Sequence, residues 1–467
     1  MSLTLADFER DALPTLMEYG TIECLSPAFN HQWATDGHLD TAIELLAHWA
    51  RGRSLGDAVI EVVRLEGRTP VLLVTLESSN GDDGTVVLYG HLDKQPPLGD
   101  WSDGLAPYSP VRRGDRLFAR GLADDGYSTF SALLALEAVI ATGEPHGRFV
   151  VLIEASEESG SPDLEPYLDH LTERLGRVEL LICLDSGALT YDRLWVTTSL
   201  RGLASVNVTV EVLTRGQHSG SASGVVPSSF RVLRQLLDRV EDPLTGRIRL
   251  PQLHAPIPVA SQRAALDLAE EFGEDVFADL PTVEGLRLMG SDVADRLLNQ
   301  TWRPTLSVVG MKGIPEPELA GNVLRPSTTA VLSFRLPPTV NAKDAVHALR
   351  RVLTTDLPDG AHVVVTGEGA NGWASPPMAP WLSRALDEAS RAHFGHAPGY
   401  TGEGGTIPFL ASLGERYPDV QFVATGVLGP HSNAHGIDEM LDLPTAVAVT
   451  NCVIDLLQKF SDRKDVA

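Results

Sequence analysis

Histidine and carboxylate side chains recur where buried strands are predicted to end, a pattern that can build a metal site. His91-Leu92-Asp93 follows the apolar segment 86–90. A histidine in this place can bind a metal ion through one ring nitrogen, while the carboxylate two residues on holds the other nitrogen. The same triplet at 38–40 lacks a preceding strand and precedes a helical pattern, so it predicts the start of a surface helix. For His91 alone, a metal ligand and a structural residue are equally supported interpretations.

Carboxylates stand at three further points. Asp124-Asp125 precedes the first predicted core helix, Glu157-Glu158 follows the apolar segment 149–153, and Asp185 follows the segment 180–184. Each has an ordinary alternative, because aspartate near a helix start is favourable by about 0.5–1 kcal/mol without a metal and Ser-Gly sequences form turns. Adjacent buried carboxylates raise one another's pKa. A cation would relieve that cost and leave one carboxylate as a general base.

A late loop adds an imidazole to this set. His431 and His435 both lie in the loop 429–439, and two histidines compete there for one role. Together, four predicted strand ends and this loop each present a His, Asp or Glu. Two cations bridged by one carboxylate need about five protein ligands of these kinds. Chance supplies one such feature easily, but not the ensemble.

The elements that must position these residues form an α/β pattern. The apolar segments 86–89, 149–153 and 180–184 alternate with helical stretches, which predicts a buried sheet covered by helices. A helix near 380–393, a strand at 422–425 and a final helix after Leu443 continue the pattern. In such sheets ligands gather at the carboxyl ends of the strands. The candidate ligands are therefore expected to meet at one edge.

The middle of the chain has a different pattern. Valines alternate with polar residues at 206–212, which predicts a half-buried strand, and a helix is expected at about 227–240 with Phe230, Leu233, Leu237 and Val240 on one face. Further strands at 305–309, 328–336 and 363–365 and a helix at 342–353 complete a β-α-β-β-α-β order, which suggests a ferredoxin-like α+β domain. Residues 242–303 are an insertion. We predict one discontinuous domain at 1–200 and 372–467, with a second domain at 201–371 inserted into it.

Composition excludes several classes of partner. With 37 basic and 62 acidic residues the formal charge is −25, so a nucleic-acid partner is not expected. No apolar run of about 18 residues could span a bilayer, and no signal peptide is visible. Cys24, Cys183 and Cys452 are far apart, which argues against a disulfide framework and fits a cytoplasmic location.

These motifs, in this order, resemble the dinuclear zinc peptidases of the carnosinase, cytosolic nonspecific dipeptidase and aminoacylase type. The likeness covers about residues 84 to 440 and rests on Gly90-His91-Leu92-Asp93, Arg120-Gly121 to Asp124-Asp125, Glu157-Glu158-Ser159-Gly160-Ser161 and Glu403-Gly404-Gly405-Thr406-Ile407-Pro408. It implies an α/β fold with a phosphorylase/hydrolase-like zinc-peptidase catalytic domain. It also implies an inserted ferredoxin-like lid that forms a homodimer.

The resemblance implies two divalent metal ions, zinc first, with manganese or cobalt as alternatives. Asp124 would bridge both ions. Glu158 and His435 would complete one site, and the Ala-His-Gly-x-Asp-Glu context favours His435 over His431. His91 and Asp185 would complete the other site.

The same resemblance assigns the catalytic groups near the metals. Asp93 would orient His91. Glu157 would be the general base that takes a proton from the bridging water and later delivers it to the leaving amine.

Substrate contacts are also implied by the resemblance. His218 and Asn322 would act across the dimer interface, although His218 could instead be a turn residue at a strand end. Arg335 would bind the substrate's free carboxylate, with an ordinary strand ion pair as its alternative. Gly405 and Thr406 would donate further hydrogen bonds to that carboxylate. An arginine is common in relatives where this chain has Gly402, and serine is commoner at Thr406, which leaves the identity of the substrate open.

The expected function is metal-dependent hydrolysis of the amide bond of dipeptides or short peptides with a free C-terminal carboxylate. An N-acyl-amino-acid deacylase or desuccinylase is the alternative with the same chemistry. A non-catalytic metal-binding homologue is a third interpretation, disfavoured by the intact Glu157 and the five candidate ligands.

Overall fold

The computed structural model of the chain describes residues 2–278, 280–405 and 408–463 and divides into two compact units. Unit 1 comprises the described residues of Met1–Thr198, Ser375–Thr401 and Ser412–Ala467. Unit 2 comprises those of Ser199–Ala374 and Gly402–Ala411. A short segment from the C-terminal part of the chain thus belongs with the middle of the chain.

Unit 1 is built on a sheet whose strands lie in the order β1-β2-β6-β3-β7-β17-β8. β3 is parallel to both β6 and β7, and β17 is parallel to β7. The strands are β1 (Val59–Val63), β2 (Val71–Leu76), β3 (Gly84–His91), β6 (Arg148–Glu154), β7 (Arg177–Cys183), β8 (Trp195–Leu200) and β17 (Gln421–Ala424), with β4 (Val111–Arg113), β5 (Arg116–Phe118) and β18 (Met440–Asp442) forming a small separate sheet and β16 (Gly399–Glu403) pairing with β8. Because β6, β3 and β7 are parallel neighbours, their carboxyl ends lie along one edge, as the sequence predicts.

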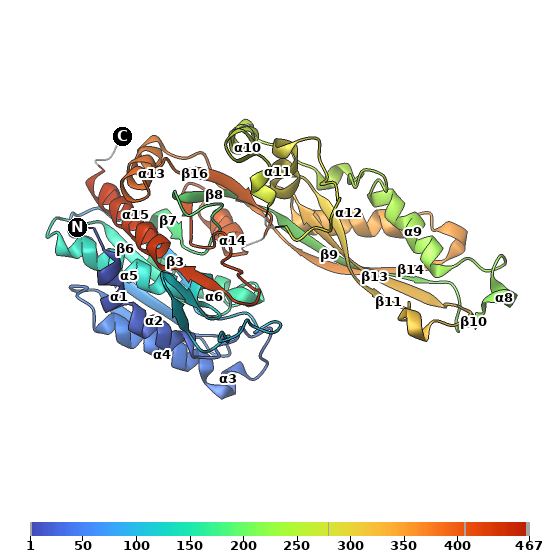
Figure 1. Cartoon of the computed structure of the whole chain (residues 1–467), viewed down its shortest axis with the longest axis horizontal. Coiled ribbons are helices and arrows are strands. Elements are labelled where there is room, and N and C mark those ends of the chain that lie inside the picture. The colour runs from blue at the N-terminus through green and yellow to red at the C-terminus, as the bar shows by residue number, and fades with distance from the viewer. Residues whose placement is uncertain (1, 279, 406–407, 464–467) are drawn as a thin grey trace. The chain divides into compact units, whose positions relative to one another are not determined.

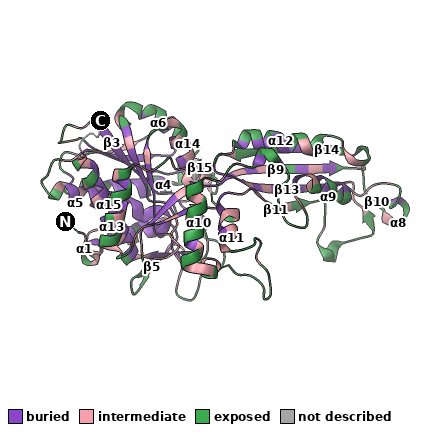
Figure 2. Cartoon of the chain, turned by 90° about the horizontal axis from the view of Figure 1, so that it is seen from above, coloured by how far each residue is buried: buried purple, intermediate pink, exposed green. Residues whose placement is uncertain are grey.

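Helices cover this sheet (Figure 1). They are α1 (Leu5–Asp11), α2 (Leu13–Gly20), α3 (Trp33–Asp36), α4 (His38–Arg51), α5 (Tyr127–Ala141), α6 (Leu164–His170), α7 (Thr172–Leu175), α13 (Pro380–His393) and α15 (Leu443–Asp462). The residues of α14 (Pro408–Arg416) are divided between the two units. α5 is buried around most of its circumference and packs against α15. Figure 2 shows burial concentrated in the strands of the sheet and in α5. The triplet at 38–40 begins α4, so its interpretation as a helix start is confirmed.

Unit 2 is built on an antiparallel sheet in the order β11-β13-β9-β14. Its elements are β9 (Gly202–Glu211), β10 (Gln217–His218), α8 (Ser219–Ala222), α9 (Ser229–Val240), α10 (Val259–Phe272), α11 (Val293–Thr301), β11 (Thr305–Lys312), β12 (Val323–Leu324), β13 (Ser327–Leu336), α12 (Ala342–Thr354), β14 (His362–Ala370) and β15 (Trp373–Ala374). β9, α9, β11, β13, α12 and β14 follow the predicted β-α-β-β-α-β order, and α9 and α12 pack on one face of the sheet. α10 and α11 lie in the insertion.

The prediction that Phe230 lies on the buried face of α9 is wrong. Phe230 is 44% exposed, whereas Val232 and Leu236 are buried with Leu233 and Val240. The buried stripe is therefore rotated by part of a helical turn from the predicted one. Local spacing allows both stripes, and packing against β9 and β13 selects between them.

Candidate active site

Five segments of unit 1 bring the candidate ligands together, and the loop of His435 is one of them. His91 is the last residue of β3, Glu157 and Glu158 lie in a turn after β6, and Asp185 follows β7. The expectation of four strand ends is wrong for Asp124, which lies in the irregular turn Leu122–Gly126 that leads into α5. In that turn the backbone N–H groups of Ala123 and Asp124 donate to the carboxylate of Glu439 and not to a neighbouring strand.

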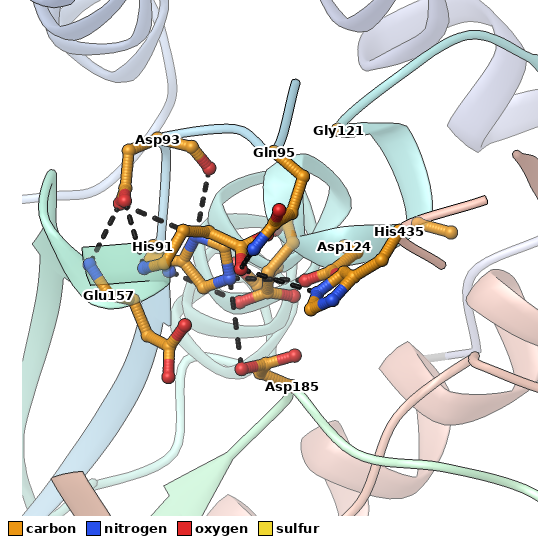
Figure 3. A network of polar contacts seen from close by, with 12 residues as sticks. His91, Asp93, Gln95, Gly121, Asp124, Glu157, Asp185 and His435 are labelled. Carbon is orange, nitrogen blue, oxygen red and sulfur yellow. Dashed lines mark hydrogen bonds and ion pairs between the residues drawn. The ribbon is translucent and has the colours of Figure 1, made fainter. Parts of the chain in front are cut away.

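Asp124 lies between the two imidazoles (Figure 3). Its Oδ1 is 3.2 Å from Nε2 of His91, and its Oδ2 is 3.0 Å from Nε2 of His435. Nε2 of His91 is also 3.7 Å from Oδ2 of Asp185, and Nε2 of His435 is 3.2 Å from Oε2 of Glu158. Each carboxylate oxygen of Asp124 thus faces a different histidine, and each histidine faces a further carboxylate. This arrangement suits a carboxylate that bridges two cations.

The charged groups of this cluster shift one another's pKa. Burial and the charges of Asp185 and Glu158 raise the pKa of Glu157 well above its ordinary value. Burial and the charge of Asp124 raise the pKa of Glu158. Burial opposes the charged form of Asp124, but hydrogen bonds from His435 and His91 outweigh it and lower the pKa of that carboxyl. Such a cluster of buried carboxylates is stabilised by positive charge placed among them.

The donor atoms also meet the chemical requirements of a divalent metal. Among the described residues, two groups have donor atoms within 4.8 Å of one another: His91, Glu157 and Asp185, and His91, Asp124 and Glu158. Imidazole nitrogen and carboxylate oxygen are ligands for zinc, manganese and cobalt. The residues present therefore fit a metal centre. Glu157, predicted as a base, lies close enough to the donors to belong to one of these groups.

Asp93 has a role that the sequence did not reveal. Its carboxylate accepts hydrogen bonds from the backbone N–H groups of Glu157 and Glu158, at 3.1 and 3.0 Å. The ring of His91 donates through Nδ1 to the backbone carbonyl of Asp93 at 3.1 Å, while the Asp93 carboxylate oxygen is 3.5 Å from Nδ1. Asp93 therefore fixes the Glu157-Glu158 turn relative to the end of β3.

Glu439 holds the turn that carries Asp124. It is fully buried, and its carboxylate accepts hydrogen bonds from Arg120 Nη1 at 2.8 Å and from the N–H groups of Gly121, Ala123 and Asp124 at 2.9, 3.1 and 3.3 Å. Arg120 also donates to the carbonyl of Gly436, in the loop of His435. One buried ion pair thus joins the segments that carry Asp124 and His435. Glu439 stands in the Ala-His-Gly-x-Asp-Glu motif, which was its signal in the sequence.

The buried side chain of Lys94 packs against the turn that carries Asp124. Its side chain is completely buried, and its ammonium donates to the carbonyls of Tyr19 and Ile22 at 3.1 and 2.9 Å. A Cβ at Gly121 would lie only 2.5 Å from Cγ of Lys94. The absence of a side chain at Gly121, whose φ is +78°, makes room for the lysine stem beneath the turn of Asp124. The only feature of the sequence that pointed to Lys94 was its position next to Asp93.

The predicted substrate-binding residues lie in unit 2. His218 is exposed at the end of β10, where its Nδ1 accepts from the N–H of Gly220 at 3.1 Å, and the carbonyl of Asn322 accepts from the N–H of Ser219 at 2.8 Å. Arg335 is half-buried in β13, and Gly405 is exposed. Thr406 lies outside the described residues. Their predicted roles stay predictions.

Comparison with known proteins decides the family. Residues 87–459 match the sequence model described as Peptidase family M20/M25/M40. The chain belongs to this family. It is a metal-dependent hydrolase of peptide bonds, and the predicted family resemblance and fold class are confirmed. Among the described residues, no helix combines the length and the apolar character needed to cross a membrane.

Individual relatives of this M20 peptidase cover most of its length. It is 27% identical over 380 residues to a cysteinylglycine-S-conjugate dipeptidase of Corynebacterium striatum, covering 80% of each chain. It is 24% identical over 404 residues to the Cys-Gly metallodipeptidase DUG1 of Saccharomyces cerevisiae, covering 84% of this chain and 82% of the relative. The solved structure of the Saccharomyces cerevisiae di-peptidase Dug1p superposes with a TM-score of 0.78 at 21% identity, covering 99% and 98% of the two chains, which supports the fold.

Proposed function

We propose that this M20 peptidase is a dipeptidase that hydrolyses the amide bond of dipeptides with a free C-terminal carboxylate. The observation that carries the proposal is the placement of Asp124, whose two oxygens face His91 and His435 at 3.2 and 3.0 Å within a cluster of further carboxylates. The two relatives named above are dipeptidases, and one of them is named as acting on Cys-Gly. Cys-Gly and related dipeptides are therefore the first substrates to test.

Two divalent ions, zinc first, would be held by the buried cluster. Asp124 would be shared between them, with Glu158 and His435 completing one site and His91 and Asp185 the other. When bound, the ions would polarise the scissile carbonyl and lower the pKa of a water molecule.

Glu157 would do the proton transfer. Its burial and its carboxylate neighbours raise its pKa, which suits a group that accepts a proton near neutral pH and then returns it to the leaving amine. Asp93 would hold Glu157 in place through the backbone N–H at 3.1 Å and would support the ring of His91. Removing the carboxylate of Glu157 should therefore abolish proton transfer without removing the ligands.

Residues 201–371, which lie within unit 2, would serve as the lid and dimerisation domain. Arg335, Gly405 and Thr406 would bind the substrate's carboxylate, and His218 and Asn322 would act across a homodimer interface. β11 supports the dimer: it is the edge strand of its sheet and exposes Val308, Val309 and Met311. An exposed apolar edge strand is a surface for pairing with another chain. Substituting Val309→Lys should turn the dimer into a monomer in light scattering, and a wild-type monomer would refute this part of the proposal.

A cytoplasmic location is part of the same proposal. The three cysteines are free and buried, as expected for a reducing compartment.

Metal analysis combined with a substrate panel tests the proposed function. The purified protein, loaded in turn with zinc, manganese and cobalt, would be assayed on Cys-Gly and other dipeptides and on N-acyl amino acids. We expect about two ions per chain and hydrolysis of dipeptides. Activity on the acyl compounds alone would establish the deacylase alternative, and metal binding without turnover on either panel would establish the non-catalytic one.

A further inference from the structure

The insertion between α9 and β11 ends in a helix that packs tightly against the segment 402–405 of unit 2. A Cβ at Gly402 would lie 2.9 Å from Cβ of Thr301, the last residue of α11, and 2.5 Å from Oγ of Ser199. A Cβ at Gly404 would lie 3.2 Å from the carbonyl oxygen of Gln300. The two distances at Gly402 are shorter than a Cβ atom normally tolerates, whereas the distance at Gly404 is only a tight contact. Thr301 of α11 and Ser199 therefore leave no space for a side chain at residue 402.

Arg201 joins α11 to the same segment. Its side chain is buried, with 8% of the residue exposed, and Nη1 donates to the carbonyl of Asn299 in α11 at 3.2 Å and to Oγ1 of Thr305 at 3.3 Å. Its backbone N–H donates to the carbonyl of Glu403 at 3.3 Å. One residue thus connects the last turn of the insertion helix, the first residue of β11 and the glycine segment.

Arg335 lies in the same corner of unit 2. In the sheet it stands opposite Thr305 of β11, the residue that accepts from Arg201. Burial and the nearby charge of Arg335 lower the pKa of Arg201 to about 10, as expected for two guanidinium groups held near each other. Two guanidinium groups therefore lie near each other beside segment 402–405, in which Gly405 is exposed. Guanidinium groups suit the binding of a carboxylate.

We infer that α11 of the insertion supports the binding site for the substrate's carboxylate. Thr301 and Arg201 are positioning residues that hold segment 402–405 beside Arg335. This inference rests on the proposed function. The insertion would then have a role in specificity, because the position of segment 402–405 against α11 determines how tightly a free C-terminal carboxylate is bound. It also explains why this chain has glycine at residue 402, where the space of a side chain is filled by Thr301 and Ser199.

Gly402→Ala in the full-length, metal-loaded enzyme is the direct test. The added methyl group must push the segment away from α11, so hydrogen bonds to the carboxylate lengthen while the cluster in unit 1 is unchanged. The assay compares a dipeptide with its C-terminal amide, which lacks the carboxylate charge. We expect KM for the dipeptide to rise by about 10-fold or more, kcat to stay within about 3-fold, and the kinetic constants for the amide to change little. Metal content should match that of the wild type.

Two further variants separate positioning from loss of folding. Arg201→Met should raise KM for the dipeptide in the same way, and Arg201→Lys should recover part of the loss because it restores one donor and the charge. In the double variant Gly402→Ala with Ser199→Ala, removal of the nearer clashing atom should also recover part of the affinity. Ser199 Oγ is buried and has no hydrogen-bond partner among the described residues, so its removal costs none of the hydrogen bonds described.

The outcomes are distinct. If the Gly402→Ala enzyme keeps the wild-type preference for the dipeptide over its amide, the inference that α11 supports the carboxylate site is overturned. Equal losses on both substrates in Gly402→Ala and Arg201→Met, without recovery in Arg201→Lys, also overturn it, because they reflect damage to the fold. If the wild-type enzyme hydrolyses no dipeptide, the proposed function itself is refuted, and the inferred role of α11 is refuted with it.

Discussion

Because of the two histidines of the cluster, the metal-binding constant should still change with pH at pH values well above 7. Partial burial opposes the charge of His435, but hydrogen bonds to Asp124 and Glu158 outweigh it and raise the pKa of the imidazole to about 11. Burial also opposes the charge of His91, yet its contacts with Asp124 and Asp93 raise its pKa well above the ordinary value. A metal ion binds only the neutral form of these rings, so it must displace a proton from each.

The size of the effect follows from the number of protons. Each proton released makes the binding constant rise about 10-fold per pH unit, so two histidines give about 100-fold per unit for loading both ions. An ordinary histidine, with a pKa near 6.5, would already be neutral above about pH 7.5 and would give no dependence there. The dependence should persist between pH 7 and pH 9, because the folded pKa of His435 lies near 11.

Competition with a chelator of known affinity at several pH values measures the binding constant, and calorimetry in buffers of different ionisation enthalpy counts the protons released. His435→Gln should lower the slope by about one proton per chain. The metal-free protein should show the opposite trend: a raised histidine pKa stabilises the fold fully below the ordinary value and progressively less as pH rises toward the folded value. A binding constant that is flat from pH 7 to pH 9, with no proton release, would refute the coupling of these histidines to Asp124 and Glu158.

Three further substitutions test other parts of the site. Glu157→Gln should leave metal content unchanged and lower kcat on dipeptides by about 10²–10⁴-fold, and near wild-type turnover would show that another group moves the proton. Glu439→Gln replaces one of the two accepting oxygens at the turn of Asp124 with an NH2 donor, so metal affinity measured by chelator competition should fall about 10–100-fold. An unchanged affinity would mean that the turn holds its shape without the carboxylate. Gly121→Ala combines a positive φ with a methyl group forced against a buried side chain and should lower the free energy of unfolding in urea by about 2–4 kcal/mol. Gly143→Ala is its control, because Gly143 has a similar φ and no atom of the described residues lies within 4 Å of its Cβ position; it should cost only about 1 kcal/mol. Equal losses would contradict the packing argument.

The sequence by itself determined the elements and the places of the candidate ligands. His91 follows an apolar segment that forms β3, and the helix predicted at 342–353 is α12, Ala342–Thr354. Such features are local: a buried strand needs a short apolar run, an amphipathic helix needs a repeat near 3.6 residues, and a ligand at a strand end follows its strand directly in the chain. The order of these elements was enough to predict the α/β sheet and the ferredoxin-like order of unit 2.

Only the tertiary structure decided how these places are held together. Glu439 and Arg120 form a buried ion pair across 319 residues of sequence, and Asp93 fixes the Glu157-Glu158 turn through backbone groups that have no signature in the sequence. The requirement for glycine at residue 402 depends on the approach of α11 from another part of the chain. Periodicity and motif spacing record only what neighbouring residues prefer. Contacts between distant segments are set when their surfaces pack, because packing selects one arrangement among the many that local preferences allow.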